Sequence, residues 1–248
     1  YGFEVRVVAV TDKLKGTVLA EDGIDIGKAL EILAAGGSLT DYPKGPGVMT
    51  GQIDPLDVLE RTSADIIAEL TYTDIKTGEP ATSYIKKALR HGKHVVTSNK
   101  GPAALHYREI KELAYSNDLQ FRFEGTVMSG TPVFHLVECG LAGNEVSEVL
   151  GILNGTTNFV LTKMETEGME YGEALALAQK LGYAEADPTA DVEGYDALAK
   201  VVILAKVLLG ASLKTQDVSR QGITSITRDD VVRARQDGFR YKLIAQAK

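Results

Sequence analysis

Short β-branched runs alternate with amphipathic helical patterns through the first half of the chain. The predicted strands cover residues 5–10, 64–71, 94–97 and 119–124, because Val, Ile and Thr favour strands. Helical patterns cover residues 26–35, 55–61, 81–90 and 105–116, and glycine follows some of them at the expected stopping position. The alternation predicts a doubly wound, Rossmann-like α/β fold, whose ligands bind beyond the carboxyl ends of parallel strands.

The pattern changes after residue 124, where Gly, Thr and Ser precede Pro132. Helices are predicted over residues 132–141, 156–165, 171–181 and 194–209, with one strand over residues 145–153. We therefore expect two domains, a nucleotide-binding domain over residues 1–124 and an α+β domain over residues 125–248.

The first domain lacks the glycine-rich turn, G-x-G-x-x-G, that normally follows the first strand of a dinucleotide-binding sheet. The strand pattern begins at what would be the second strand, and the chain stops in an apolar stretch without a closing element. We expect the first domain to be incomplete at its amino end and the second at its carboxyl end. A chain without the turn should bind dinucleotide poorly, because the pyrophosphate normally rests there.

Composition narrows the class of protein. The 248 residues are 44% hydrophobic and 25% charged, with a formal net charge of −7, as in an ordinary globular protein. Acidic and basic residues are interspersed, so no basic stripe is available for nucleic acid or an anionic membrane. No apolar run approaches the roughly 20 residues of a membrane span, and the first residues carry no export signal. The sequence predicts a cytoplasmic protein without nucleic-acid or membrane partners.

The single cysteine, Cys139, follows a helical pattern and is expected to be a small buried side chain. It has no partner for an internal disulfide. The four histidines show no metal-ligand spacing with it or with one another, so a zinc site is not expected.

The predicted helix over residues 194–209 is apolar almost all round, which indicates a buried helix. Asp196 and Lys200 lie four residues apart on one face of it, and burying either charge alone would be costly. Two interpretations stay open: a surface ion pair at the start of the helix, or a lysine acid/base held by a carboxylate.

Three carboxylates lie in the loop just before that helix. Glu185, Asp187 and Asp191 surround Pro188, which stiffens the loop. They could form a cation site, or they could be solvated loop charges and helix caps, because Asp commonly serves turns and N-caps. Asp191 is well placed to cap the helix that follows.

Several motifs together resemble the homoserine dehydrogenase family. They are the run Gly-Ile-Leu-Asn-Gly-Thr-Thr-Asn-Phe at 151–159, the run Ala-Gln-Lys-Leu-Gly-Tyr-Ala-Glu-Ala-Asp-Pro at 178–188, and the run Asp-Val-Glu-Gly-Tyr-Asp-Ala-Leu-Ala-Lys at 191–200. The strand end Val-Val-Thr-Ser-Asn-Lys at 95–100 resembles the family as well. The similarity runs from about Val5 to Leu209 and so covers most of the chain.

The resemblance implies roles for the catalytic and substrate-binding residues. Lys200 would be the general acid/base at the substrate oxygen, with Asp196 beside it and Lys100 near the nicotinamide and substrate. Glu185 would help to hold the ammonium group of the substrate. The implied substrate-binding residues are Glu185, Asp191 and Tyr183.

The resemblance also implies a nicotinamide cofactor, either NAD or NADP. Thr71 and Ser98, at strand ends, would lie along the cofactor together with Lys100. Asp12, at the end of the first predicted strand, is where a ribose 2′-hydroxyl is usually bound. Lys13 and Lys15 nearby leave a 2′-phosphate possible.

A monovalent-cation loop, for sodium, is the last element that the resemblance implies. Its ligands would be Glu124 and the backbone carbonyls of Val127, Ser129 and Thr131. Carbonyl ligands do not depend on side-chain identity, although this loop has less glycine than many members of the family. A plain turn containing Gly and Pro is the alternative interpretation.

The reaction that the resemblance implies is reversible, NAD(P)-dependent hydride transfer between L-homoserine and L-aspartate 4-semialdehyde, with the aldehyde reduced in the physiological direction. The alternatives are a related dehydrogenase of small amino acids and a non-catalytic regulatory domain of the same fold. The presence of Glu185 and of the Asp196 and Lys200 pair argues against the first alternative. These residues and Lys100 argue against the second, which the missing glycine-rich turn would favour. The resemblance further implies a homodimer formed through the second domain.

Overall fold

The computed structural model describes residue 2 and residues 4–248 and divides into two compact units. The first unit contains the chain up to Tyr72, with residues 79–97 and 108–123. The second contains residues 73–78, 98–107 and 124–248. The chain passes into the second unit for the last time between Phe123 and Glu124, beside the predicted domain boundary, but two short segments of the N-terminal half also belong to that unit.

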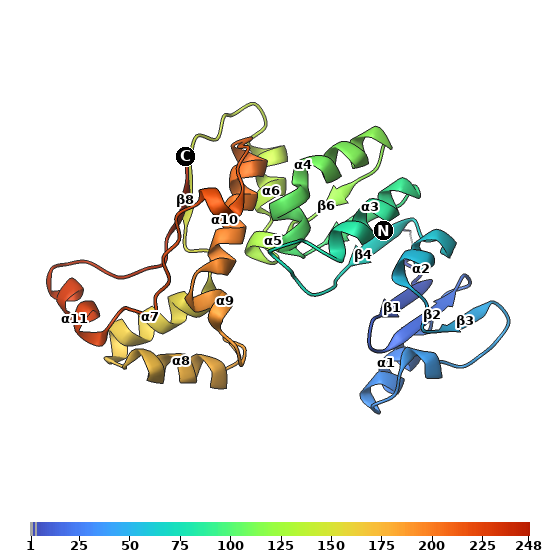
Figure 1. The fold of residues 1–248 in the computed structure, drawn as a ribbon, viewed down its shortest axis with the longest axis horizontal. Coiled ribbons are helices and arrows are strands. Elements are labelled where there is room, and N and C mark those ends of the chain that lie inside the picture. The colour runs from blue at the N-terminus through green and yellow to red at the C-terminus, as the bar shows by residue number, and fades with distance from the viewer. Residues whose placement is uncertain (1, 3) are drawn as a thin grey trace. The chain divides into compact units, whose positions relative to one another are not determined.

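A parallel sheet organises part of the first unit (Figure 1). Its order is β4 (Ile66–Glu69), β5 (His94–Thr97) and β6 (Phe121–Arg122), and Glu69 is in register with Thr97. The crossover helices are α3 (Ala81–Arg90) and α4 (Lys100–Ser116), the second of which begins in the other unit. Leu59 of α2 (Pro55–Arg61) packs with Ile85, Leu89, Val95 and Ile110 in the core. The predicted Rossmann-like α/β fold is confirmed, and the bounds of α2, α3 and β5 agree with the sequence pattern.

The first predicted strand is wrong in position and pairing. Residues 5–8 form no strand, and β1 (Ala9–Asp12) instead pairs antiparallel with β2 (Gly16–Ala20), which pairs antiparallel with β3 (Val48–Gly51). The chain turns back because Asp12 Oδ1 accepts hydrogen bonds from the backbone N–H of Leu14 and Lys15, at 2.7 and 2.8 Å. All five residues of β2 are buried, whereas Val5 is 78% exposed.

The apolar residues of this antiparallel sheet pack against the segment that links β2 to β3. Helix α1 (Ile26–Ala34) and the 3-10 turn η1 (Leu39–Asp41) lie in that segment, as Figure 1 shows beside the sheet. The buried residues of the core that they share with the sheet are Val18 and Ala20 of β2, with Ile24, Ala29, Leu39 and Tyr42 of the linking segment. The apolar residues of β2, α1 and η1 are therefore buried together in a small core on one face of an antiparallel meander.

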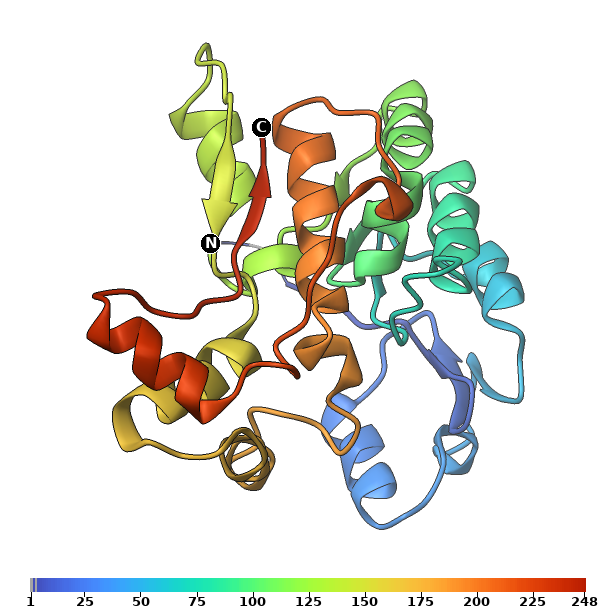
Figure 2. The same ribbon diagram turned by 60° about the vertical axis from the view of Figure 1, so that its left-hand side comes forward.

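The second unit contains most of the helices. In chain order these are α5 (Gly125–Met128), α6 (Val133–His135), the π-helical turn η2 (Leu136–Gly140), α7 (Gly155–Glu167), α8 (Tyr171–Lys180), α9 (Thr189–Val192), α10 (Tyr195–Leu208), the turn η3 (Thr215–Asp217) and α11 (Arg228–Gln236). Its strands, β7 (Val149–Gly151) and β8 (Ala245–Ala247), pair antiparallel and appear side by side in Figure 2. The helices α7, α8 and α11 share a core that includes Leu161, Met164, Ala178 and Val231.

Helix α10 is the buried helix that the sequence predicted. The residues from Val201 to Ala205 are all buried, and Ala197 and Ala199 are buried as well. A helix with so little polar surface is held by packing on several sides. In the second unit it contacts α5, α9 and β8. Among the residues that the structure describes, no helix is long and apolar enough to cross a membrane.

The prediction that Cys139 is buried is wrong. The residue lies in η2, none of whose residues is buried, and its side chain is exposed. Its sulfur lies 3.7 Å from Nδ1 of His135, one turn earlier. The helical pattern around Cys139 is present, but the turn lies at the surface, where the neighbouring Leu136 and Leu141 are exposed as well.

Gly222 packs closely against the turn that joins α9 to α10. A Cβ at this position would lie 2.6 Å from the carbonyl oxygen of Val192 and 2.8 Å from Cα of Glu193. The next residue, Ile223, donates its backbone N–H to the same Val192 carbonyl at 2.8 Å. The segment after α10 therefore holds the turn through backbone contacts that leave no room for a side chain.

We expect Gly222→Ala to lower the free energy of unfolding by about 1–3 kcal/mol, because an added methyl group in a packed contact forces the backbone to shift. Urea denaturation monitored by circular dichroism measures the change. Gly172→Ala is the matched control, since a Cβ on Gly172 in α8 has open space and alanine favours a helix by up to about 1 kcal/mol. An unchanged denaturation midpoint for Gly222→Ala would show that the turn tolerates a side chain.

Candidate active site

The pair of Asp196 and Lys200 forms a shielded ion pair at the start of α10. Lys200 Nζ lies 2.6 Å from Asp196 Oδ2, and the two side chains are only 16% and 12% exposed. The same ammonium donates a hydrogen bond to the backbone carbonyl of Leu153 at 2.7 Å. An ammonium has three N–H donors, so one remains for another acceptor. Both side chains are thus more shielded than those of an ordinary surface ion pair.

Lys100 approaches the other oxygen of the same carboxylate. Its Nζ lies 3.5 Å from Asp196 Oδ1, and its side chain is 26% exposed. Lys100 is the first residue of α4, and the next residue, Gly101, lies so close to the loop over residues 73–78 that a Cβ would be 2.5 Å from the Asp74 carbonyl oxygen. The start of α4, which carries Lys100, is therefore fixed by a backbone contact.

Asp74 stabilises the loop that meets Gly101. Its Oδ2 accepts a hydrogen bond from the Thr77 hydroxyl at 2.7 Å, and its Oδ1 accepts one from the Lys76 N–H at 2.7 Å. The Thr77 hydroxyl, and after it the Lys76 N–H, holds the pKa of Asp74 below its usual value. The carboxylate is thus kept charged by the turn that it organises.

Asn154 links two carboxylates from the amino end of α7. It is 4% exposed, and its amide nitrogen donates to Asp191 Oδ1 at 2.6 Å and to Asp196 Oδ2 at 3.0 Å. Its amide oxygen accepts from the N–H of Thr157 at 2.8 Å and so caps α7. The side chain belongs to the helix cap and to the carboxylate cluster at once.

Asp191 lies inside this cluster and caps no helix. Its Oδ2 is 2.8 Å from the Thr156 hydroxyl, which is also 2.7 Å from the Tyr183 carbonyl oxygen. The prediction that Asp191 caps α10 is wrong, because Gly194 takes that position and no side chain caps the helix. A left-handed residue with φ of 78° is needed there, and glycine adopts it without strain.

The cluster is close to electrically neutral. The two carboxylates, Asp191 and Asp196, are balanced by the two ammonium groups, Lys100 and Lys200. Hydrogen bonds from Asn154 and Thr156 supply neutral donors. Buried charges that are paired and hydrogen-bonded avoid most of the cost of desolvation.

The loop before α9 presents side chains of a different kind. Glu185 is exposed, and among the described residues its carboxylate has no hydrogen-bond or ion-pair partner. The Tyr183 ring stacks on Phe159, with ring centroids 4.8 Å apart. Thr189 lowers the pKa of Asp187 through its side chain and then its N–H, so that Asp187 is the turn residue expected as one alternative. Across the part of the chain that the structure describes, no three acidic, His or Cys side chains converge as a metal site.

The cofactor residues expected in the first unit lie at polar strand ends. Glu69, at the end of β4, is 4% exposed and accepts hydrogen bonds from the Thr71 N–H at 2.8 Å and from the Thr71 and Thr97 hydroxyls at 2.5 and 2.9 Å. Thr71 itself is exposed. Asp12 lies in the β1–β2 turn described above. Their contacts with a cofactor stay predictions.

The remaining expected residues belong to the second unit. Ser98 is exposed and lies against Gly125. A Cβ added to Gly125 would be 3.1 Å from the Cβ of Ser98. The two oxygens of Glu124 accept hydrogen bonds from the N–H groups of Phe134 and His135, at 2.8 and 3.1 Å. Glu124 therefore holds the start of α6.

The carbonyls of the expected cation loop are only partly engaged. The Thr131 carbonyl accepts a hydrogen bond from the Val133 N–H at 2.9 Å. Ser129 has a positive φ of 53°, which turns the loop sharply. A carbonyl oxygen has two lone pairs, so an accepted hydrogen bond leaves a position for a cation.

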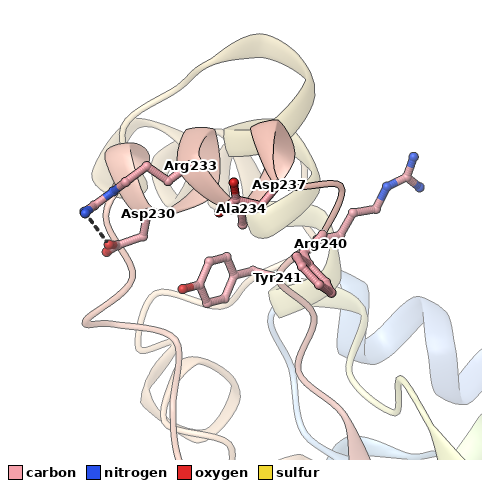
Figure 3. Close-up of a pocket in the computed structure, with 7 residues that line it drawn as sticks. Asp230, Arg233, Ala234, Asp237, Arg240 and Tyr241 are labelled. Atoms are coloured by element: carbon pink, nitrogen blue, oxygen red, sulfur yellow. Dashed lines mark hydrogen bonds and ion pairs between the residues drawn. The ribbon is translucent and has the colours of Figure 1, made fainter.

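A shallow pocket lies elsewhere in the second unit (Figure 3). It has a volume of about 460 Å³ and is lined by α11 and the segment after it, including Asp230, Arg233, Arg240 and Tyr241. Arg233 is paired with Asp230 at 3.0 Å, and Arg240 with Glu165 at 3.1 Å. None of the carboxylates or lysines of the cluster lines it, so the chemistry is not placed there.

The sequence singled out Lys100, Asp191, Asp196 and Lys200, and the structure brings them together. Sequence reasoning missed the roles of Asn154, Thr156 and the Leu153 carbonyl. The signal was present as an Asn-Gly-Thr-Thr run before a helical pattern, which is typical of an N-cap. That the cap also reaches two carboxylates more than 30 residues away could be seen only in the fold.

Comparison with known proteins assigns this arrangement to one family. The sequence profile described as "Homoserine dehydrogenase" matches residues 132–248. The NAD(+)-dependent homoserine dehydrogenase of Pseudomonas canavaninivorans is 50% identical over 248 residues, which cover 99% of this chain and 68% of that protein. The homoserine dehydrogenase of Methanocaldococcus jannaschii is 42% identical, with coverage of 99% of this chain and 71% of its own length.

Solved structures agree with the sequence comparison. A protein of Archaeoglobus fulgidus assigned to the homoserine dehydrogenases superposes with a TM-score of 0.86 at 36% identity, covering 99% of this chain and 71% of that one. A hyperthermophilic archaeal homoserine dehydrogenase in complex with NADPH has a TM-score of 0.78 at 29% identity, with coverage of 97% and 68%.

Proposed function

The chain belongs to the homoserine dehydrogenase family, and from this membership we propose that it catalyses reversible hydride transfer between L-homoserine and L-aspartate 4-semialdehyde. It is an oxidoreductase that uses a nicotinamide cofactor, and the reaction belongs to aspartate-family amino-acid biosynthesis, which leads to threonine, methionine and isoleucine. The observation that carries the proposal is the shielded cluster in which Lys100 and Lys200 meet the carboxylate of Asp196.

Lys200 is the general acid/base at the substrate oxygen. Two of its donors are held by Asp196 and the Leu153 carbonyl, so the third is available to protonate the alkoxide formed when the aldehyde is reduced. In the reverse direction the lysine accepts the proton of the hydroxyl. The nicotinamide, when bound, supplies or takes the hydride.

Lys100 provides a second positive charge beside the same carboxylate. Its ammonium lies 3.5 Å from Asp196 and so can share this anion with Lys200 while it orients the polar groups of the substrate. Fixed charges stabilise an oxyanion strongly when little water is present. The backbone contact at Gly101 keeps Lys100 in place before substrate binds.

Glu185, Asp191 and Tyr183 bind the substrate. An ammonium group needs a carboxylate partner when it leaves water. Glu185 is exposed, and in the described part of the chain its carboxylate has no partner, whereas Asp191 is already engaged by Asn154 and Thr156. Glu185 is therefore the residue that receives the ammonium, and Tyr183 lies two residues earlier in the same loop.

Thr71, Ser98, Lys100 and Asp12 contact the cofactor. The polar strand ends around Glu69 suit a dinucleotide, because ligands of such a sheet bind beyond the carboxyl ends of its strands, where Thr71 and Thr97 lie. We propose NAD as the preferred cofactor. The 50%-identical relative is named as NAD(+)-dependent, and the Asp12 carboxylate would accept a ribose 2′-hydroxyl and repel a 2′-phosphate.

A monovalent cation, sodium, is proposed at Glu124 and the carbonyls of Val127, Ser129 and Thr131. These oxygen ligands suit a hard cation, and the Glu124 charge is not neutralised by its two N–H donors. The cation would stabilise the loop that begins the second unit's C-terminal part. We further propose a cytoplasmic homodimer formed through residues 125–248, without nucleic-acid or membrane partners.

A side-by-side assay tests the reaction and the cofactor together. We expect the full-length protein to oxidise NADH with aspartate 4-semialdehyde, with kcat/KM for NADH exceeding that for NADPH by roughly tenfold, which corresponds to about 1.4 kcal/mol. Absorbance at the nicotinamide band follows both reactions. Turnover with neither cofactor would contradict the proposed function, and a preference for NADPH would contradict the role given to Asp12.

Lys200→Met should lower kcat by roughly 10²- to 10⁴-fold and leave the affinity for the cofactor nearly unchanged, because acid/base assistance is lost while the side-chain volume is kept. Lys86→Met is the matched control: Lys86 is 18% exposed and paired with Glu109 at 2.7 Å, much as Lys200 is paired with Asp196. The control should keep its kcat. Wild-type turnover in Lys200→Met would remove Lys200 from the mechanism.

Glu185→Gln should raise KM for homoserine far more than KM for the cofactor, because it removes the charge and keeps the shape. It should also reduce the preference for homoserine over an analogue without the amine, since a polar site discriminates by leaving its own group unpaired. Asp187→Asn, in the same loop, is the charge-matched control and should leave both KM values unchanged. If the Gln variant kept its full preference for the amine, the ammonium site would lie elsewhere.

A further inference from the structure

We propose that Asn154 is a positioning residue, whose carboxamide holds the Asp191 and Asp196 carboxylates in place and thereby sets the orientation of Lys200. This inference rests on the proposed function, in which Lys200 acts at the substrate oxygen. Asn154 itself lies one residue from Leu153, whose carbonyl binds the same ammonium. Two adjacent residues thus act on Lys200: Leu153 supplies one of its partners, and Asn154 holds the other, Asp196.

The hydrogen bonds of Asn154 define which way its amide points. The oxygen accepts from the Thr157 N–H at 2.8 Å and lies 2.9 Å from the Thr157 hydroxyl. A flipped amide would turn its NH₂ group toward the Thr157 N–H and its oxygen toward two carboxylates, so both contacts would be repulsive. The NH₂ group therefore faces Asp191 and Asp196, and each of its two protons goes to a different carboxylate.

Asp196 depends on that donor for its position. Its Oδ2 receives both the Asn154 amide, at 3.0 Å, and the Lys200 ammonium, at 2.6 Å. Without the amide, Oδ2 would be anchored only by the lysine whose orientation it is meant to fix. A shielded carboxylate that loses a donor also bears a desolvation cost and moves toward water or another donor.

Asp191 makes the amide a bridge between helices. Asp191 belongs to α9 and Asp196 to α10, while Asn154 caps α7. The charged groups that face the amide or its two acceptors are Asp191, Asp196, Lys100 and Lys200. A neutral group with two donors and one acceptor fits this place, and no charged side chain of the same size does.

An aspartate in place of the asparagine separates positioning from simple packing. Ionised, it would have the shape of asparagine but only acceptors, facing two other carboxylates. Protonated, it would recover one donor. Two neighbouring carboxylates favour its protonated form, so the activity of Asn154→Asp relative to wild type should depend on pH. A merely structural defect should lower the relative activity by the same factor at every pH.

The test compares kcat for NADH-dependent reduction of aspartate 4-semialdehyde in the full-length wild type, Asn154→Asp and Asn154→Ser. We expect Asn154→Asp to lose roughly 10- to 100-fold in kcat at neutral pH, as a small misplacement of a reacting group can, and to recover relative to wild type as the pH falls. KM for NADH should not change. Asn154→Ser keeps a helix cap but is too short to reach both carboxylates, so it should lose a similar factor at every pH.

Thr227→Ala is the control for loss of a helix cap alone. Thr227 caps α11 because its hydroxyl oxygen accepts a hydrogen bond from the backbone N–H of Asp230 at 3.2 Å, and it touches neither carboxylate of the cluster. It should lower the melting temperature and leave kcat and its pH profile unchanged. A constant ratio of Asn154→Asp to wild-type activity across pH, or full activity of a folded Asn154→Ser, would overturn the proposal. Absence of activity in the wild type would instead overturn the proposed function.

Discussion

A lysine ammonium withdrawn from water must be given acceptors, and the second unit is built around that requirement at Lys200. The side chain starts on α10, a helix whose buried residues are apolar, and is only 16% exposed, so within its own helix Asp196 is the acceptor that it meets. The Leu153 carbonyl completes the set, and it is available because the chain leaves β7 and turns into α7 at that residue. The position of α7 relative to α10 is therefore coupled to the charge on one side chain.

The same coupling explains why small residues occur around the cluster. Gly194 provides the left-handed turn that lets α9 end and α10 begin without a side-chain cap, and Gly222 lets the later segment approach that turn. Gly101 does the same for the start of α4. Gly101 and Gly222 allow a backbone to come close to an element that bears a charged side chain, whereas Gly194 supplies the left-handed conformation.

The sequence was a good guide where one physical constraint acted locally. The apolar periodicity of α10 and its paired Asp196 and Lys200 could be predicted because a buried helix cannot carry unpaired charges. Prediction failed where the outcome depended on distant partners. The run from Val5 to Val10 has strand propensity, but only Ala9 and Val10 of it belong to a strand, which a turn at Asp12 pairs antiparallel with the buried strand β2. Likewise, Asp191 reads as a helix cap until Asn154 and Thr156 are seen to bind it.

Two shielded carboxylates in this chain show how the donors around an acid decide its use. Glu69 is held by hydroxyl and backbone donors of Thr71 and Thr97, which orient it and cannot exchange a proton usefully near neutral pH. Asp196 is held by two ammonium groups and an amide, and an ammonium can give up a proton and recover it. The first arrangement suits a residue that fixes strand ends where a cofactor is expected. The second suits the proton transfer that we propose for Lys200, because the ammonium lies beside the carboxylate in a shielded place.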